Sequence, residues 1–207
     1  MTETAPSPRR GRPVDQAARS AKIRHILDSA RICFARDGFH RAGTADICRE
    51  AGISPANLYQ YFSSKDDIIV AIAEEYRSDD LALLAEIDRR GPLPAAITTG
   101  FDELAAEIES DQLYPRLRLE ILAEATRNPR VRAVVSAAER DVQTELTRMI
   151  AAAQAKGELA RTLAADDLAS LILALYDGVF ARHVALGVAM PLAGMGAMLR
   201  KVLEVEG

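Results

Sequence analysis

The segment SPANLYQY, residues 54–61, carries two side-chain amides, Asn57 and Gln60, among hydroxyl-bearing and small side chains. An Asn or Gln side chain can form paired hydrogen bonds with an adenine edge in the major groove of DNA, and small apolar groups can contact thymine methyls. Hydroxyl groups, lysines and helix N-termini suit phosphate oxygens. The residue types of this segment therefore favour a surface that contacts nucleic acid.

The predicted contacts divide into two sets. The residues that we expect to face base edges are Asn57, Gln60, Ala56 and Pro55. The residues that we expect to position phosphates are Thr44, Ser54, Tyr59, Tyr61 and Lys65. Thr44 and Lys65 lie at predicted helix starts, where backbone N–H groups also point outward.

Two short helices are predicted to hold this surface. Thr44 can cap a helix that runs to about Ala51, and Gly52 ends it at a turn where a positive φ is needed. Ser54 caps the next helix, with Pro55 at its first position, and this helix runs to about residue 62. Two short helices joined by a tight turn form a helix-turn-helix. Its predicted core positions are Ile47, Ala51, Ile53 and Leu58.

A family resemblance supports this interpretation. The stretch GTADICREAGISPANLYQYFSSKDDII, residues 43–69, resembles the N-terminal signature of TetR/AcrR-family regulators. The matching residues are Thr44, Ile47, Ala51, Gly52, Ser54, Tyr59, Tyr61, Phe62 and Lys65. Cys48 replaces the usual Ala, and Ile53 the usual Val. The resemblance covers roughly residues 20–70 and implies a DNA-binding transcription regulator.

The whole chain of 207 residues is predicted to be all-α. A first helical stripe runs from Ile23 to Phe34 and stops before Gly38, and we find no segment with the period of a strand. Further helices are predicted over 64–89, 94–109, 115–127, 129–155, 166–186 and 191–205, separated by Gly- and Pro-containing breaks. We expect a flexible arm at 1–19, a DNA-binding domain at 20–66 and a larger helical domain at 67–207.

The charge distribution is uneven along the chain. Residues 1–65 hold 11 Lys and Arg against 6 Asp and Glu, whereas the remainder holds 15 against 24. A basic front on an acidic body indicates a front that meets a polyanion. Within it, RRGRP at residues 9–13 is similar to the core of an AT-hook, in which Arg10 and Arg12 would enter a narrow minor groove. The alternative is a solubilising tail with general attraction to phosphates.

The resemblance also implies that the larger domain binds a small ligand and pairs with a second copy through its last two helices, so that a homodimer binds a palindromic operator. The predicted pairing residues are Leu168, Leu171, Ile172, Leu175, Val179, Leu192, Met195, Met198, Leu199 and Val202. The alternative is that these residues are ordinary core. Candidate ligand contacts, which could also be core, are Leu84, Phe101, Leu104, Leu119, Leu122, Val135, Arg118, Glu120, Tyr176 and His183.

Repression is the expected activity, with activation or a ligand-independent architectural role as alternatives. An enzyme is disfavoured because the three histidines are scattered and no nucleophile motif occurs. Acidic pairs such as Asp66-Asp67, Asp79-Asp80 and Asp166-Asp167 are expected at helix starts or on solvated faces. The two cysteines, Cys33 and Cys48, suggest buried thiols, with no disulfide framework, metal site or cofactor. No secretory signal is apparent, and the apolar run 168–176 is too short to span a bilayer, so we expect a cytoplasmic protein that contacts no membrane.

Overall fold

The computed structural model describes residues 16–110, 113–187 and 201, and only the backbone at 104, 105, 107–109, 179 and 180. The described part of the chain is helical with no strand, which confirms the all-α prediction. Arg10, Arg12 and nearly all of the helix predicted over 191–205 lie outside the described residues.

Three helices form the N-terminal unit: α1 (Gln16–Asp37), α2 (Thr44–Glu50) and α3 (Pro55–Leu58). Helix α1 begins before the arm boundary expected at residue 20. The N-cap of α2 is Gly43 and not Thr44 as predicted, because the Asp46 carboxylate accepts a hydrogen bond of 2.8 Å from the Gly43 N–H. Gly52 has φ +61°, so the turn between α2 and α3 has the left-handed conformation that its sequence predicted.

Helix α3 is shorter than expected. Ser54 caps it as predicted, its hydroxyl accepting a hydrogen bond of 3.2 Å from the Asn57 N–H. The α-helical pattern ends at Leu58, however, and the chain continues through turns in which the N–H groups of Gln60 and Tyr61 bond to carbonyls three residues earlier. These tighter turns carry the chain to Ser64, which caps the next helix by accepting from the Asp67 N–H at 3.1 Å.

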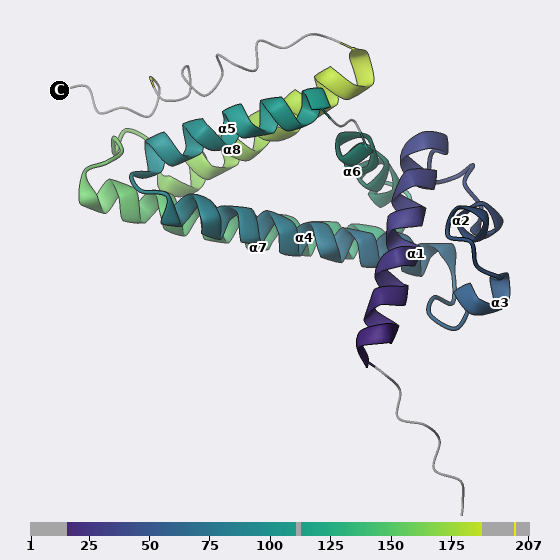
Figure 1. Cartoon of the computed structure of the whole chain (residues 1–207). Coiled ribbons are helices and arrows are strands. Elements are labelled where there is room, and N and C mark those ends of the chain that lie inside the picture. Colours follow the sequence, from purple (N-terminus) through teal and green to yellow (C-terminus); the bar gives the residue numbers. More distant parts are fainter. Residues whose placement is uncertain (1–15, 111–112, 188–200, 202–207) are drawn as a thin grey trace, which may run out of the picture.

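Five long helices complete the described chain: α4 (Lys65–Arg89), α5 (Leu93–Ser110), α6 (Leu113–Ala125), α7 (Pro129–Lys156) and α8 (Ala165–Phe180), which continues in a π-helical turn at Ala181–Ala185. Their bounds confirm the predicted helices to within a few residues. Helices α4 and α7 lie side by side and extend away from the N-terminal unit, with α5 and α8 alongside them (Figure 1). Ion pairs join Asp67 to Arg130 at 2.6 Å and Asp88 to Arg148 at 2.9 Å, so α4 and α7 run in the same direction.

The buried side chains form two clusters. The first contains the faces of α1, α2 and α3 together with the start of α4, much of α6 and Val131 of α7. The second joins the far halves of α4 and α7 to α5 and α8. Both cysteines belong to the first cluster, as predicted. Because α6 packs into the first cluster, the core around the helix-turn-helix extends well beyond residue 66.

Helix α8 has apolar side chains on more than one face. Leu168 and Ile172, predicted to face a second subunit, are instead buried in the second cluster, because α8 packs on α7 of its own chain. Leu171 is 50% exposed and Leu175 is partly buried. The side chain of Val179, and all of Leu192, Met195, Met198, Leu199 and Val202, lie outside the described residues.

The continuous helix Ala165–Ala185, unlike the apolar run 168–176 within it, is long and apolar enough to cross a membrane. This criterion is weak evidence, because core helices of soluble proteins also meet it.

Candidate DNA-binding surface and ligand cavity

The recognition segment, residues 54–61, presents most of its predicted contact side chains to solvent. Ser54, Pro55, Ala56 and Gln60 are exposed, and Tyr59 is 52% exposed. Leu58 is completely buried between them and anchors the segment to the core. The arrangement places a small, mostly uncharged polar face on the outside of the helix-turn-helix.

Two members of the segment are less exposed than predicted. Asn57 is half-buried, and its Oδ1 atom has no hydrogen-bond partner within the described residues. Tyr61 is also half-buried and packs against the first cluster, with the guanidinium of Arg19 5.1 Å from the centre of its ring. Arg19 was assigned to the flexible arm from its sequence, but in α1 it lies beside the recognition segment. The position of Arg19 before the apolar stripe of α1 did not predict its contact with Tyr61.

The first residue of α2 contacts the end of α3. The Thr44 hydroxyl lies 3.4 Å from the Tyr59 hydroxyl, so two predicted phosphate contacts are neighbours in space although 15 residues separate them. Two adjacent hydroxyl groups at a helix start form a suitable surface for a phosphate oxygen.

Lys65 makes contacts within the protein that its sequence did not predict. Its Nζ donates hydrogen bonds to the carbonyls of Phe39 and Ala42, at 2.6 and 3.1 Å, and lies 4.2 Å from the centre of the Phe39 ring. The ammonium group therefore holds the connection between α1 and α2 in place, whatever further contact its remaining N–H makes.

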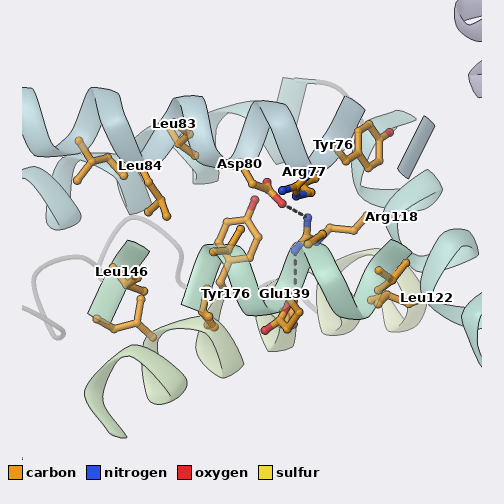
Figure 2. Close-up of a pocket in the computed structure, with 18 of the residues that line it drawn as sticks. Tyr76, Arg77, Asp80, Leu83, Leu84, Arg118, Leu122, Glu139, Leu146 and Tyr176 are labelled. Carbon is orange, nitrogen blue, oxygen red and sulfur yellow. Dashed lines mark hydrogen bonds and ion pairs between the residues drawn. The ribbon is translucent and has the colours of Figure 1, made fainter. Parts of the chain in front are cut away.

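A cavity of about 150 Å³ lies between α4, α5, α6, α7 and α8, where the two buried clusters meet. One end is apolar, with side chains such as Leu84, Phe101 and Leu146. The other end is polar, and Figure 2 shows Asp80, Arg118 and Tyr176 there. An apolar pocket with a few converging polar groups is the usual form of a small-molecule site.

Charged groups at the polar end are connected through Arg118. Its guanidinium lies 3.2 Å from the Asp80 carboxylate, 3.4 Å from that of Asp177, and 5.2 Å from the centre of the Tyr176 ring. The side chains of Arg118 and Asp80 are each only 18% exposed. Asp80 was expected on a solvated face beside Asp79, and this expectation is wrong because Asp80 points between the helices towards α6.

The cavity changes the ionisation of its acidic groups. Burial raises the pKa of the Asp80 carboxyl, although the Arg118 charge partly opposes this effect. Glu139 is still exposed to solvent, but partial desolvation by its neighbours, together with the nearby Asp177 charge, also raises its pKa. Burial raises the pKa of Tyr114 to about 12, and this hydroxyl lies 3.5 Å from Asp80. The polar end is therefore a place where negative charge is costly.

Some of the predicted ligand contacts line the cavity and others do not. Those that line the cavity are Leu84, Phe101, Leu122, Val135, Arg118 and Tyr176. Leu119, Glu120 and His183 lie outside its wall, and the side chain of Leu104 lies outside the described part. The helical period explains why Arg118 and Leu122 of α6 line the cavity and Glu120 does not, because positions 118, 121 and 122 share the face opposite Glu120. Sequence reasoning missed Asp80, Glu139 and Asp177, whose acidic types looked like solvated surface.

The opposite face of α6 contacts the N-terminal unit. The Glu120 carboxylate accepts a hydrogen bond of 3.0 Å from the Phe39 N–H, and Glu124, only 5% exposed, lies 3.2 Å from the His40 ring. Phe39 and His40 belong to the connection that leads into α2. Helix α6 thus contacts both the cavity and the helix-turn-helix.

A helix-turn-helix with an exposed polar face, joined to a helical domain with a ligand-sized cavity, defines the class of DNA-binding transcriptional regulators. The family model described as "Bacterial regulatory proteins, tetR family" matches residues 26–72. A second model, "BetI-type transcriptional repressor, C-terminal", matches residues 96–206. The chain belongs to the TetR family of transcriptional regulators.

Three relatives illustrate the similarity. The chain is 31% identical to the HTH-type transcriptional regulator UidR of Escherichia coli K12 over 156 residues, 75% of this chain and 78% of UidR. It is 26% identical to the nicotine-responsive transcriptional repressor HdnoR of Paenarthrobacter nicotinovorans over 161 residues, 77% of this chain and 82% of HdnoR. The structure of Salmonella enterica GusR superposes with a TM-score of 0.75 at 29% identity, covering 89% of this chain and 96% of GusR.

Proposed function

We propose that this chain is a cytoplasmic repressor that binds a palindromic operator as a homodimer, and that its affinity for this DNA falls when a small molecule occupies the cavity. The observation that carries the proposal is the position of α6, which lines the cavity with Arg118 and Ile121 and bonds to the helix-turn-helix through Glu120. The nicotine-responsive repressor HdnoR supports a response to a small ligand.

For DNA recognition, Gln60, Asn57, Ala56 and Pro55 are the proposed base contacts. The proposed phosphate contacts are Thr44, Tyr59, Ser54 and Tyr61, to which we add Arg19 because of its place beside the segment. Two recognition segments related by a two-fold axis would enter successive major grooves, about 34 Å apart. We further propose that Arg10 and Arg12 strengthen binding, so that deletion of residues 1–13 weakens it and flattens its salt dependence.

Release would follow from a change in population between two arrangements of the dimer. A ligand that pushes α6 away from α4 would displace the carboxylates of Glu120 and Glu124, and with them the connection that leads into α2. Helix α4 would transmit the same change, since it lines the cavity and begins four residues after the end of the recognition segment. Linkage of this kind is typically about 1–3 kcal/mol, and nearly complete release needs about 5 kcal/mol.

The second subunit is proposed to cover the exposed side of α8. Leu171 of α8 is 50% exposed, and Leu186, just after the π-helical turn that follows α8, is 65% exposed. Contiguous exposed apolar patches mark protein interfaces, and a second subunit seated here would cover both side chains.

Selection of bound DNA from a random pool tests the proposal. We expect an enriched palindrome, and we expect its affinity to change in the presence of a ligand found by screening against the cavity. A pool without a palindrome would contradict the dimeric reading, and an affinity unchanged by every bound ligand would favour a ligand-independent architectural protein. A reporter gene behind the selected sequence distinguishes a repressor from an activator.

A further inference from the structure

The polar end of the cavity has more negative than positive charge. Asp80, Asp177 and Glu139 contribute three carboxyl groups to its wall, and Arg118 contributes the guanidinium that lies between two of them. The other cation of the wall, Arg77, directs its Nε and one terminal nitrogen at Asp141, which does not line the cavity. Within the described part of the chain, Glu139 forms no ion pair.

We propose that the ligand of this cavity is a small organic cation, a protonated amine whose ammonium group lies among Glu139, Asp80 and Asp177 and whose apolar body lies against Leu84 and Phe101. This inference rests on the proposed function, since it names the class of effector for the same cavity.

The balance of charge decides between the possible ligand classes. A cation supplies the counter-charge that one guanidinium cannot supply to three carboxyl groups, of which Asp80 is 18% exposed, Asp177 is 42% exposed and Glu139 lies at the exposed edge of the wall. An anion would have to approach those carboxyl groups and compete with two of them for Arg118. A neutral ligand would remove water from the carboxyl groups without replacing it by a charge, which is unfavourable. Burial is the main cause of the raised pKa values of Asp80 and Glu139, and a bound cation would offset that cost of negative charge at the polar end.

The size and lining of the cavity limit the body of the ligand. Its volume of about 150 Å³ is close to that of an engineered cavity known to bind benzene. The apolar wall, which includes Ile97, Phe101 and Val142, offers no hydrogen-bonding group to the far end of a ligand. A single ring or a short branched chain carrying one ammonium group matches both limits.

A matched series of probes tests the charge. Phenethylammonium, 2-phenylethanol and 3-phenylpropanoate have similar bodies and carry a positive, a zero and a negative charge. We expect calorimetric titration of the full chain to give millimolar or tighter binding of the cation, at least about tenfold tighter than binding of the alcohol. Equal affinities, tightest binding of the anion, or binding of none of the three would each overturn the inference.

A matched pair of variants locates the cation. Glu139→Gln removes the carboxylate while keeping the shape of the side chain. We expect it to weaken the binding of phenethylammonium by about fivefold, as for an ion pair that solvent partly screens, and to leave the binding of 2-phenylethanol unchanged. The control is Glu145→Gln on the same helix, which removes an equal charge from an ion pair with Arg148 outside the cavity. If both variants weaken the binding of phenethylammonium equally, the carboxylates act on its charge only at long range, and the assigned position of the ammonium group is wrong.

The proposed function and the cation site can be refuted independently of each other. A protein that binds a palindrome but not phenethylammonium retains the proposed function and loses this inference. A protein that binds phenethylammonium through Glu139 but selects no DNA retains the cation site and loses the proposed function.

Discussion

Lys65 offers the sharpest test of how the helix-turn-helix is held together. We propose that its ammonium group stabilises the connection between α1 and α2, where it donates to the carbonyls of Phe39 and Ala42. The Lys65→Met variant keeps most of the aliphatic chain and removes the charge. It therefore isolates the two hydrogen bonds and the contact with the Phe39 ring.

The expected loss of stability follows from those contacts. A hydrogen bond to a charged group contributes about 1.5–3 kcal/mol, and two bonds that share one ammonium group contribute less than twice that value, so we expect about 2–3 kcal/mol. For a chain of this length the melting temperature should fall by roughly 5–10 °C. Urea unfolding followed by circular dichroism measures the free energy directly.

A salt titration separates this role from a phosphate contact. A lysine that neutralises one phosphate adds about 0.9 to the slope of log K against log salt, so its removal should flatten the slope by that amount. We expect the Lys65→Met slope to be unchanged. Arg41→Met, an exposed cation in the same connection, is the control for stability and should unfold like the parent protein. A Lys65→Met protein of unchanged stability with a flatter salt slope would refute the structural role.

Three further predictions concern other parts of the molecule. Gly52→Ala should destabilise the protein by about 1–2 kcal/mol, and Gly52→Asn by less, because residue 52 has a φ of +61°. An added Cβ would meet no atom within 4 Å, so the cost comes from the backbone conformation alone. Equal urea midpoints for the parent and Gly52→Ala would contradict this prediction. Hydrogen bonds from Arg130 and Ser64 lower the pKa of Asp67, so its carboxylate stabilises the fold above the ordinary aspartate pKa of 3.8 and that contribution is lost as the pH falls through the lower folded-state value. Asp67→Asn should therefore be less stable at neutral pH, and its deficit in urea unfolding should shrink in acid; a constant deficit would count against the linkage. Leu171→Asp should convert the proposed dimer to a monomer in sedimentation velocity, and an unchanged mass would place the interface elsewhere.

The sequence predicted the helices and the recognition segment because these depend on local signals. Ser54 and Pro55 mark the start of α3, and Gly52 marks the turn before it, independently of the rest of the fold. The length of α3 was overestimated, since its end depends on how the chain must bend to place Phe62 in the core and begin α4 at Lys65.

The cavity could be predicted only in part, because its polar end is assembled from four helices. Apolar candidates such as Leu84 and Phe101 followed from the helical period, but the period does not tell which acidic residues turn inward. Asp80 and Asp177 meet only because Arg118 of α6 lies between α4 and α8. Leu168 shows the same limit, since an apolar face on a helix does not reveal whether its own chain or a partner covers it.

The central claim is that the exposed face of residues 54–61 reads DNA sequence, and the affinity of the Gln60→Ala variant for the selected palindrome tests it most directly. Gln60 is exposed and its side chain forms no hydrogen bond within the described residues, so its replacement should leave the fold intact. We expect specific affinity to fall by about 1–3 kcal/mol per subunit, with unchanged non-specific binding and an unchanged salt slope. Full affinity for the palindrome, or an equal loss on unrelated DNA, would contradict the account.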